Sequence, residues 1–88
     1  MKINEEFVLR EIAGEAMLIP VGETAGRVNG MVTLNETAAF IWKELAAGKD
    51  ETGVLKAMLE SFEVEEATAR ADISETLEAL KRNGLIEG

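Results

Sequence analysis

The first third of the chain alternates between short apolar segments and turn-forming residues. A β-compatible segment runs from Phe7 to Ala13, and a continuous apolar segment follows from Ala16 to Val21. Gly14 separates the two, so the pattern predicts a β-hairpin that turns near this glycine. The second segment is apolar enough for a central strand. Pro20 indicates where that strand ends, because proline donates no hydrogen bond to a ladder.

A third extended segment is predicted from Arg27 to Leu34. Because side chains alternate along a strand, its residues divide into one face with Val28, Val32 and Leu34 and another with Asn29, Met31 and Thr33. Gly30 lies inside this segment, where a glycine often indicates a bulge or the close approach of another backbone.

The rest of the chain has helical spacing. Asn35 is expected to cap a first helix that ends near Gly48, Asp50 a second helix, and a third helix is predicted from about Glu66 to Asn83. The apolar positions that recur at helical spacing are Ala38, Ile41, Trp42 and Leu45, then Leu55, Met58, Leu59 and Phe62, and finally Ile73, Leu77 and Leu80. Three strands followed by three helices predict an α+β fold. The helices cover one face of a three-stranded antiparallel sheet, and the sheet keeps two edges.

Composition indicates a single globular domain over residues 1–88, since 47% of the residues are apolar and 30% are charged. The chain has no cysteine, so it can form neither a disulfide nor a thiolate metal site. No apolar segment approaches the roughly 20 residues of a membrane span. These features favour a cytoplasmic protein without a membrane partner.

The chain also lacks histidine and tyrosine, which together with the missing cysteine removes the commonest general base, metal ligand and nucleophile. Three carboxylates on the last predicted helix, Asp72, Glu75 and Glu78, lean away from its apolar side and are interpreted as a solvated polar face. We therefore predict a protein that is not an enzyme and has neither a cofactor nor a catalytic or metal site.

A small sheet with three helices is typical of winged-helix proteins, many of which bind DNA. The charge argues against such a partner, because 17 acidic and 9 basic residues give a net charge of -8 that repels phosphate backbones. Between Glu63 and Ala79, Arg70 is the only basic residue among six acidic ones. A winged-helix transcription regulator remains an alternative function for this winged-helix-like fold.

The sequence from Gly30 to Trp42, GMVTLNETAAFIW, resembles the pyrroloquinoline-quinone biosynthesis protein D family, PqqD. The second amphipathic helix ending at Phe62 and the final KRNGLIEG are similar to the same family in the same order, so the resemblance covers nearly the whole chain. It implies a winged-helix domain that binds the leader of a ribosomally made precursor peptide and presents it to a radical S-adenosylmethionine enzyme.

The resemblance also implies where the leader binds: as an added strand against the segment from Arg27 to Thr33, packed toward the helix from Glu66 to Leu80. On that helix Ala69 and Thr76 flank the apolar side and are expected to form the groove floor without belonging to the core. Arg70 and Lys81 lie on the opposite flank, either paired with acidic leader residues or solvated. The predicted peptide-binding residues are Arg27, Val28, Asn29, Gly30, Met31, Val32, Thr33, Ala69, Arg70, Ile73, Thr76 and Leu80.

A further alternative uses the same sheet edge differently. An open edge can pair with a second copy of the chain, which would give a structural homodimer whose interface is the site assigned to the leader.

Overall fold

The computed structural model describes residues 2–22 and 32–87. Its main sheet has three antiparallel strands, β2 (Phe7–Ile12), β3 (Glu15–Pro20) and β4 (Val32–Leu34), in the order β2-β3-β4. Ala13 and Gly14 both have positive φ, 53° and 83°, and form the turn between β2 and β3. The predicted hairpin, and the central place of its second strand, are thus confirmed.

The pairing of β3 with β4 defines which side chains enter the core. Leu18 lies opposite Val32 and Ala16 opposite Leu34. Leu18 and Leu34 are buried, whereas Thr33, between Val32 and Leu34 on β4, is exposed. This alternation agrees with the predicted faces over residues 32–34, the part of the third strand that the structure describes.

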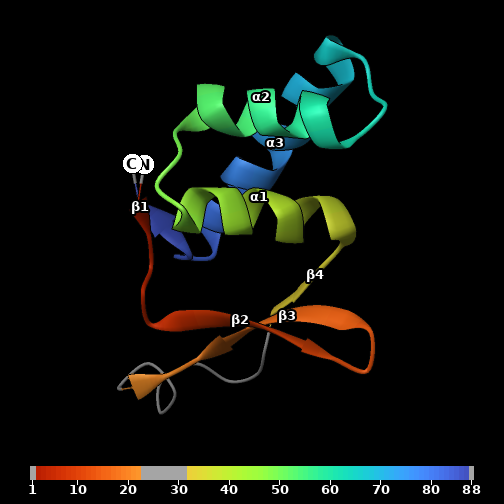
Figure 1. Ribbon diagram of the computed structural model, residues 1–88. Helices are drawn as coiled ribbons and strands as arrows, with labels where there is room; N and C mark the ends of the chain where they lie inside the picture. The colour runs from red at the N-terminus through yellow and green to blue at the C-terminus, as the bar shows by residue number, and fades with distance from the viewer. Residues whose placement is uncertain (1, 23–31, 88) are drawn as a thin grey trace.

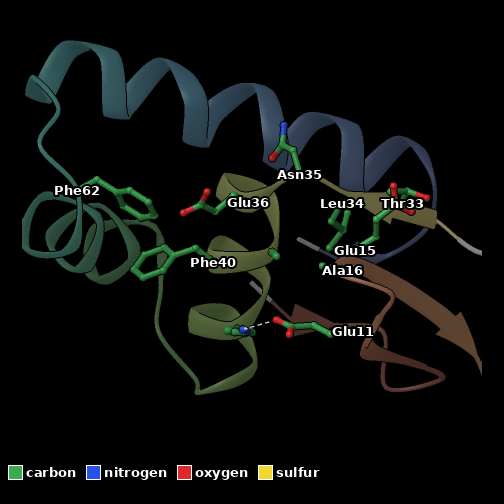
Figure 2. Close-up of a pocket in the computed structure, with 12 residues that line it drawn as sticks. Glu11, Glu15, Ala16, Thr33, Leu34, Asn35, Glu36, Phe40 and Phe62 are labelled. Atoms are coloured by element: carbon green, nitrogen blue, oxygen red, sulfur yellow. Dashed lines mark ion pairs between the residues drawn. The ribbon is translucent and has the colours of Figure 1, made fainter.

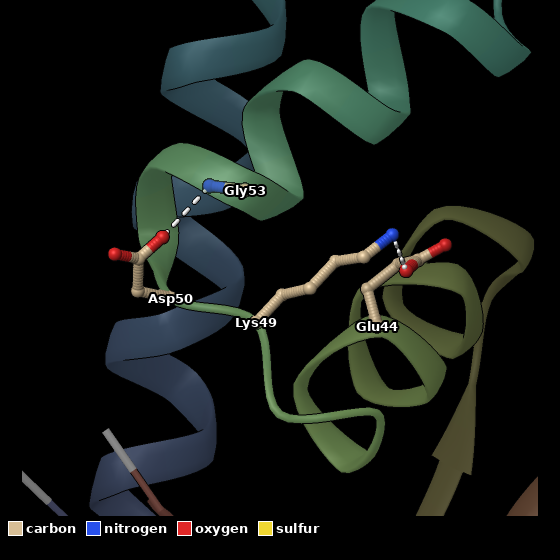
Figure 3. Close-up of polar contacts among 4 residues, drawn as sticks. All are labelled: Glu44, Lys49, Asp50 and Gly53. Carbon is tan, nitrogen blue, oxygen red and sulfur yellow. Dashed lines mark hydrogen bonds and ion pairs between the residues drawn. The ribbon is translucent and has the colours of Figure 1, made fainter.

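Three helices follow the sheet: α1 (Glu36–Ala46), α2 (Glu51–Ser61) and α3 (Glu66–Arg82). The Asn35 Oδ1 accepts a hydrogen bond from the amide of Ala38 at 2.7 Å, as expected of an N-cap. Asp50 caps α2 through the Gly53 amide at 2.8 Å, and just before it a 2.6 Å ion pair joins Lys49 to Glu44 (Figure 3).

The helices stack on one side of the sheet, with α1 nearest to it and α2 farthest away (Figure 1). α1 contacts β3, β4, α2 and α3, so it lies at the centre of the molecule. Its Trp42 is 2% exposed, and Met58 of α2 and Ile73 of α3 are equally well buried. Trp42 and Met58, two of the apolar positions at helical spacing, thus lie in the core.

A second, two-stranded sheet joins the two ends of the described chain, and the sequence pattern did not predict it. β1 (Lys2–Ile3) pairs antiparallel with β5 (Ile86–Glu87), and the Asn4 amide donates to the Leu85 carbonyl at 2.8 Å. Leu85 and Ile86 are buried, as expected of a segment that folds back onto the core after Gly84. Among the described residues, no helix is both long and apolar enough to cross a membrane.

Candidate functional site

The strand β4 is the starting point of the candidate site. It pairs with β3 along one side, and no strand in the described part of the chain pairs with its other side. The backbone amides and carbonyls on such an edge remain available to another extended chain. Asn35 and α1 follow β4 directly, so the strand is anchored at its end by a capped helix.

A groove of about 330 Å³ lies between β4 and the C-terminal half of α3. It also takes in the start of α1 and the segment after α3. Its lining residues are Val32, Thr33 and Leu34 of β4, Asn35 and Ala38, Glu75, Thr76, Ala79, Leu80 and Asn83, and Leu85.

The groove has a leucine floor and a polar rim. Leu80 and Leu85 are 3% and 1% exposed, so they belong to the core as well as to the groove. Ala38 and Ala79 are half-buried, and their small side chains leave space above the leucines. Asn83 at the rim donates a hydrogen bond to the Ala79 carbonyl at 2.7 Å. This arrangement suits apolar side chains that enter from the β4 edge.

The structure brings four of the predicted residues together in this groove: Val32, Thr33, Thr76 and Leu80. The predicted residues Arg27, Val28, Asn29, Gly30 and Met31 lie outside the described residues.

Three other predicted residues lie nearer the start of α3 and do not line the groove. Arg70 and Ile73 line a separate depression of about 180 Å³ formed with the start of α2. The expectation that Ala69 stands clear of the core is wrong, because it is 0% exposed within the hydrophobic core. The reason is that α2 packs against α3 and covers this part of the helix.

The flanking charges are also placed by the structure. Arg70 forms an ion pair with Glu66, one turn earlier, at 3.0 Å, and Lys81 is exposed without lining the groove. Glu75 is the one charged residue among the described residues that line the groove. The sequence pattern alone assigns Glu75 to a solvated face.

The sequence contains a signal for the missed residues. Thr76, Ala79, Leu80 and Asn83 follow the spacing i, i+3, i+4, i+7, which defines one stripe of a helix. The predicted residues Thr76 and Leu80 belong to this stripe, whereas Ala69 and Ile73 lie outside it, nearer the start of α3.

A larger hollow of about 820 Å³ lies on the hairpin side of α1 (Figure 2). Phe40 and Phe62 meet edge to face at one end of it, with ring centroids 5.1 Å apart. Glu11, at the other end, lies 3.8 Å from the Lys43 Nζ in a well-exposed ion pair. The hollow is wider and more polar than the groove. It shares Thr33, Leu34 and Asn35 with the groove, so the two meet at the end of β4.

Catalytic or metal chemistry finds little support in the described residues. Glu75 and Glu78 are exposed and Asp72 is half-buried on the surface of α3. No group of three or more histidine, cysteine, aspartate or glutamate side chains within residues 2–22 and 32–87 is arranged to hold a metal ion.

The fold and the groove define a winged-helix-like α+β domain with an open strand edge beside its last helix. The family model described as coenzyme PQQ synthesis protein D (PqqD) matches residues 8–86, and the chain belongs to this family. Comparison with curated proteins gave no match.

Two solved structures share the fold over nearly their full length. One is TbiB1 in complex with the TbiA(beta) leader peptide, with 27% identity, a TM-score of 0.81, and coverage of 100% of this chain and 96% of that one. The other is lasso peptide synthetase B1 complexed with the leader peptide, with 26% identity, a TM-score of 0.80, and coverage of 99% and 96%.

Proposed function

We propose that this protein binds the leader segment of a ribosomally made precursor peptide, as a strand added to β4 and packed into the groove along α3. The observation that carries the proposal is the open edge of β4 beside that groove. It occurs in a fold that matches two proteins solved with leader peptides bound.

Strand addition accounts for both parts of the site. The backbone groups of β4 give an extended peptide hydrogen bonds that depend little on its sequence. Alternate side chains of that peptide then point toward α3, where the alanines and leucines of the groove distinguish apolar residues from polar ones. Affinity and specificity thus come from different elements.

We further propose that the protein is a non-catalytic cytoplasmic adaptor that presents the leader to a separate modifying enzyme. The absence of histidine, cysteine and tyrosine supports a role without chemistry of its own. That the enzyme is a radical S-adenosylmethionine enzyme is implied by the PqqD resemblance. Copurification of the enzyme with the adaptor, with and without leader, tests this pairing directly.

The binding site is tested by two single proline substitutions in β4, Val32→Pro and Thr33→Pro. Neighbouring residues of a strand direct their amides to opposite sides, so one substitution removes an amide facing β3 and the other an amide at the open edge. Proline at the open edge is tolerated in the fold. The variant that keeps its thermal stability should therefore lose binding of a labelled leader by more than tenfold.

To obtain the labelled leader, the reading frames beside the gene are searched for a short precursor peptide, and its N-terminal segment is synthesised. If both variants fold and bind as the parent does, β4 is not the binding edge. Sedimentation of the parent distinguishes the homodimer alternative: a dimer that dissociates when leader is added uses the same edge, whereas a monomer leaves the edge to the peptide alone.

A further inference from the structure

We propose that Glu75 makes the groove select a leader segment carrying a lysine or arginine two residues from its apolar anchor. This inference rests on the proposed function and adds the chemistry of the peptide that the site accepts. It gives the leader the opposite charge from the alternative in which Arg70 and Lys81 pair with acidic leader residues.

The first observation is the sign of the charge inside the groove. Glu75 is exposed at the rim, and no described residue gives its carboxylate a hydrogen bond or an ion pair. Arg70, which we had expected to face the leader, lines the depression beside α2 and is paired with Glu66. Among the described residues, a peptide in this groove therefore meets one charged side chain, and that side chain is negative.

The second observation is that α3 supplies no cation to Glu75. The residues one turn away at i-4 and i+4 are Ala71 and Ala79, and those at i-3 and i+3 are Asp72 and Glu78. Acidic neighbours at this spacing repel one another by a few tenths of a kcal/mol. A cation from a bound peptide relieves this repulsion and forms its pair at a partly enclosed surface.

The third observation gives the spacing of the motif. Ala79 lies four residues from Glu75, about 6 Å along the helix axis. Side chains on one face of an extended peptide recur every second residue, about 6.6 Å apart. For a peptide strand that runs along α3, an apolar side chain seated between Ala79 and Ala38 places the side chain two positions along the peptide beside Glu75. The expected motif is an apolar residue and a basic residue at i and i+2, in either order.

A library of random 12-residue peptides displayed on phage, panned against the full chain, provides the probe. The parent should enrich an apolar residue with lysine or arginine at the i+2 or i-2 position. Glu75→Lys should enrich aspartate or glutamate at that same position. Glu60→Lys is the matched control, because Glu60 is exposed on α2, does not line the groove, is not within one helical turn of Glu75, and undergoes the same charge change.

Affinities of one selected peptide then measure the effect by fluorescence anisotropy. Glu75→Gln should weaken binding about threefold to fivefold, the range of a favourable exposed pair. Glu75→Lys should weaken binding further. A peptide in which the basic residue is replaced by glutamate should bind the Glu75→Lys variant better than the original peptide does, but should bind the parent less well. Circular dichroism confirms that both variants fold.

The inference is overturned if the Glu75→Lys pool keeps the basic preference, or if Glu60→Lys shifts the preference equally, since the overall negative field would then be the cause. Ala79→Trp separates this failure from failure of the proposed function. If the selected peptides lose binding to Ala79→Trp but show no preference for a basic residue, only the role of Glu75 is refuted. Selected peptides that bind Ala79→Trp as well as the parent refute the groove itself, and both proposals with it.

Discussion

The N-terminal and C-terminal halves of α3 have similar apolar spacing but different neighbours. In the first half, Ala69 and Ile73 are closed off beside α2 and are at most 1% exposed. In the second half, Thr76 and Ala79 are half-buried and line the groove beside β4. The first half is covered by α2, whereas the second half contributes Leu80 to the core and still leaves one side open to a ligand. The difference shows that the place where a second helix docks, more than the helix's own pattern, determines which residues can bind.

The largest expected effect is that of Ala69→Trp in the closed half. A tryptophan has no space at a residue that is 0% exposed, so the free energy of unfolding should fall by about 3 kcal/mol or more. Urea unfolding followed by circular dichroism measures the change. A variant as stable as the parent would show that this half of α3 is not closed.

The next effect is that of Ala79→Trp in the open half, which is the matched counterpart of Ala69→Trp. Because Ala79 lines the groove and is only half-buried, we expect the unfolding free energy to change by less than about 1 kcal/mol. Leader binding should weaken more than tenfold, or about 1.4 kcal/mol, because the indole fills the space above the leucines. Unchanged leader affinity, measured by calorimetry, would place the ligand elsewhere.

A smaller effect is expected at the start of α3. Glu65 is its N-cap residue but makes no capping hydrogen bond with its side chain. Glu65→Ser should supply that bond and raise the unfolding free energy by about 0.5 to 1 kcal/mol, with leader affinity unchanged. Asn35→Ala is the converse control, since it removes an existing cap and should lower stability by about 1 kcal/mol. A change in leader affinity with Glu65→Ser would link the closed half to binding.

The smallest effect is expected from Arg70→Ala. The ion pair with Glu66 is well exposed, with 64% and 60% of the two side chains accessible, so its loss should cost at most about 0.5 kcal/mol of stability. Leader affinity should remain within twofold of the parent, because Arg70 lies outside the groove. A tenfold loss of leader affinity would show that Arg70 belongs to the binding site.

The elements with strong local signals could be predicted from the sequence. Asn35 and Asp50 cap their helices as expected, and Gly14 forms the turn of the hairpin. The pairing of β1 with β5 could not be predicted. A strand of two residues is too short to show an alternation of apolar and polar side chains, and the two strands are far apart in sequence.

The candidate site was only partly predictable for a related reason. The contributions of β4 and α3 are implied by the resemblance to the PqqD family, and helical spacing then places Thr76 beside Leu80. Ala79, Glu75 and Asn83 were missed because the helix pattern alone does not say which stretch α2 covers. Ala69 was misassigned for the same reason: a small residue beside an apolar seam is equally suited to a groove and to a close helix contact.

The burial of Trp42 has a spectroscopic consequence. The chain has one tryptophan and no tyrosine, so its near-ultraviolet emission comes from a single indole that is 2% exposed. Because Trp42 does not line the groove, its emission should be blue-shifted in the native protein, shift to the red on denaturation, and remain constant during a leader titration. Intrinsic fluorescence thus reports the integrity of the core independently of ligand occupancy, without any added label.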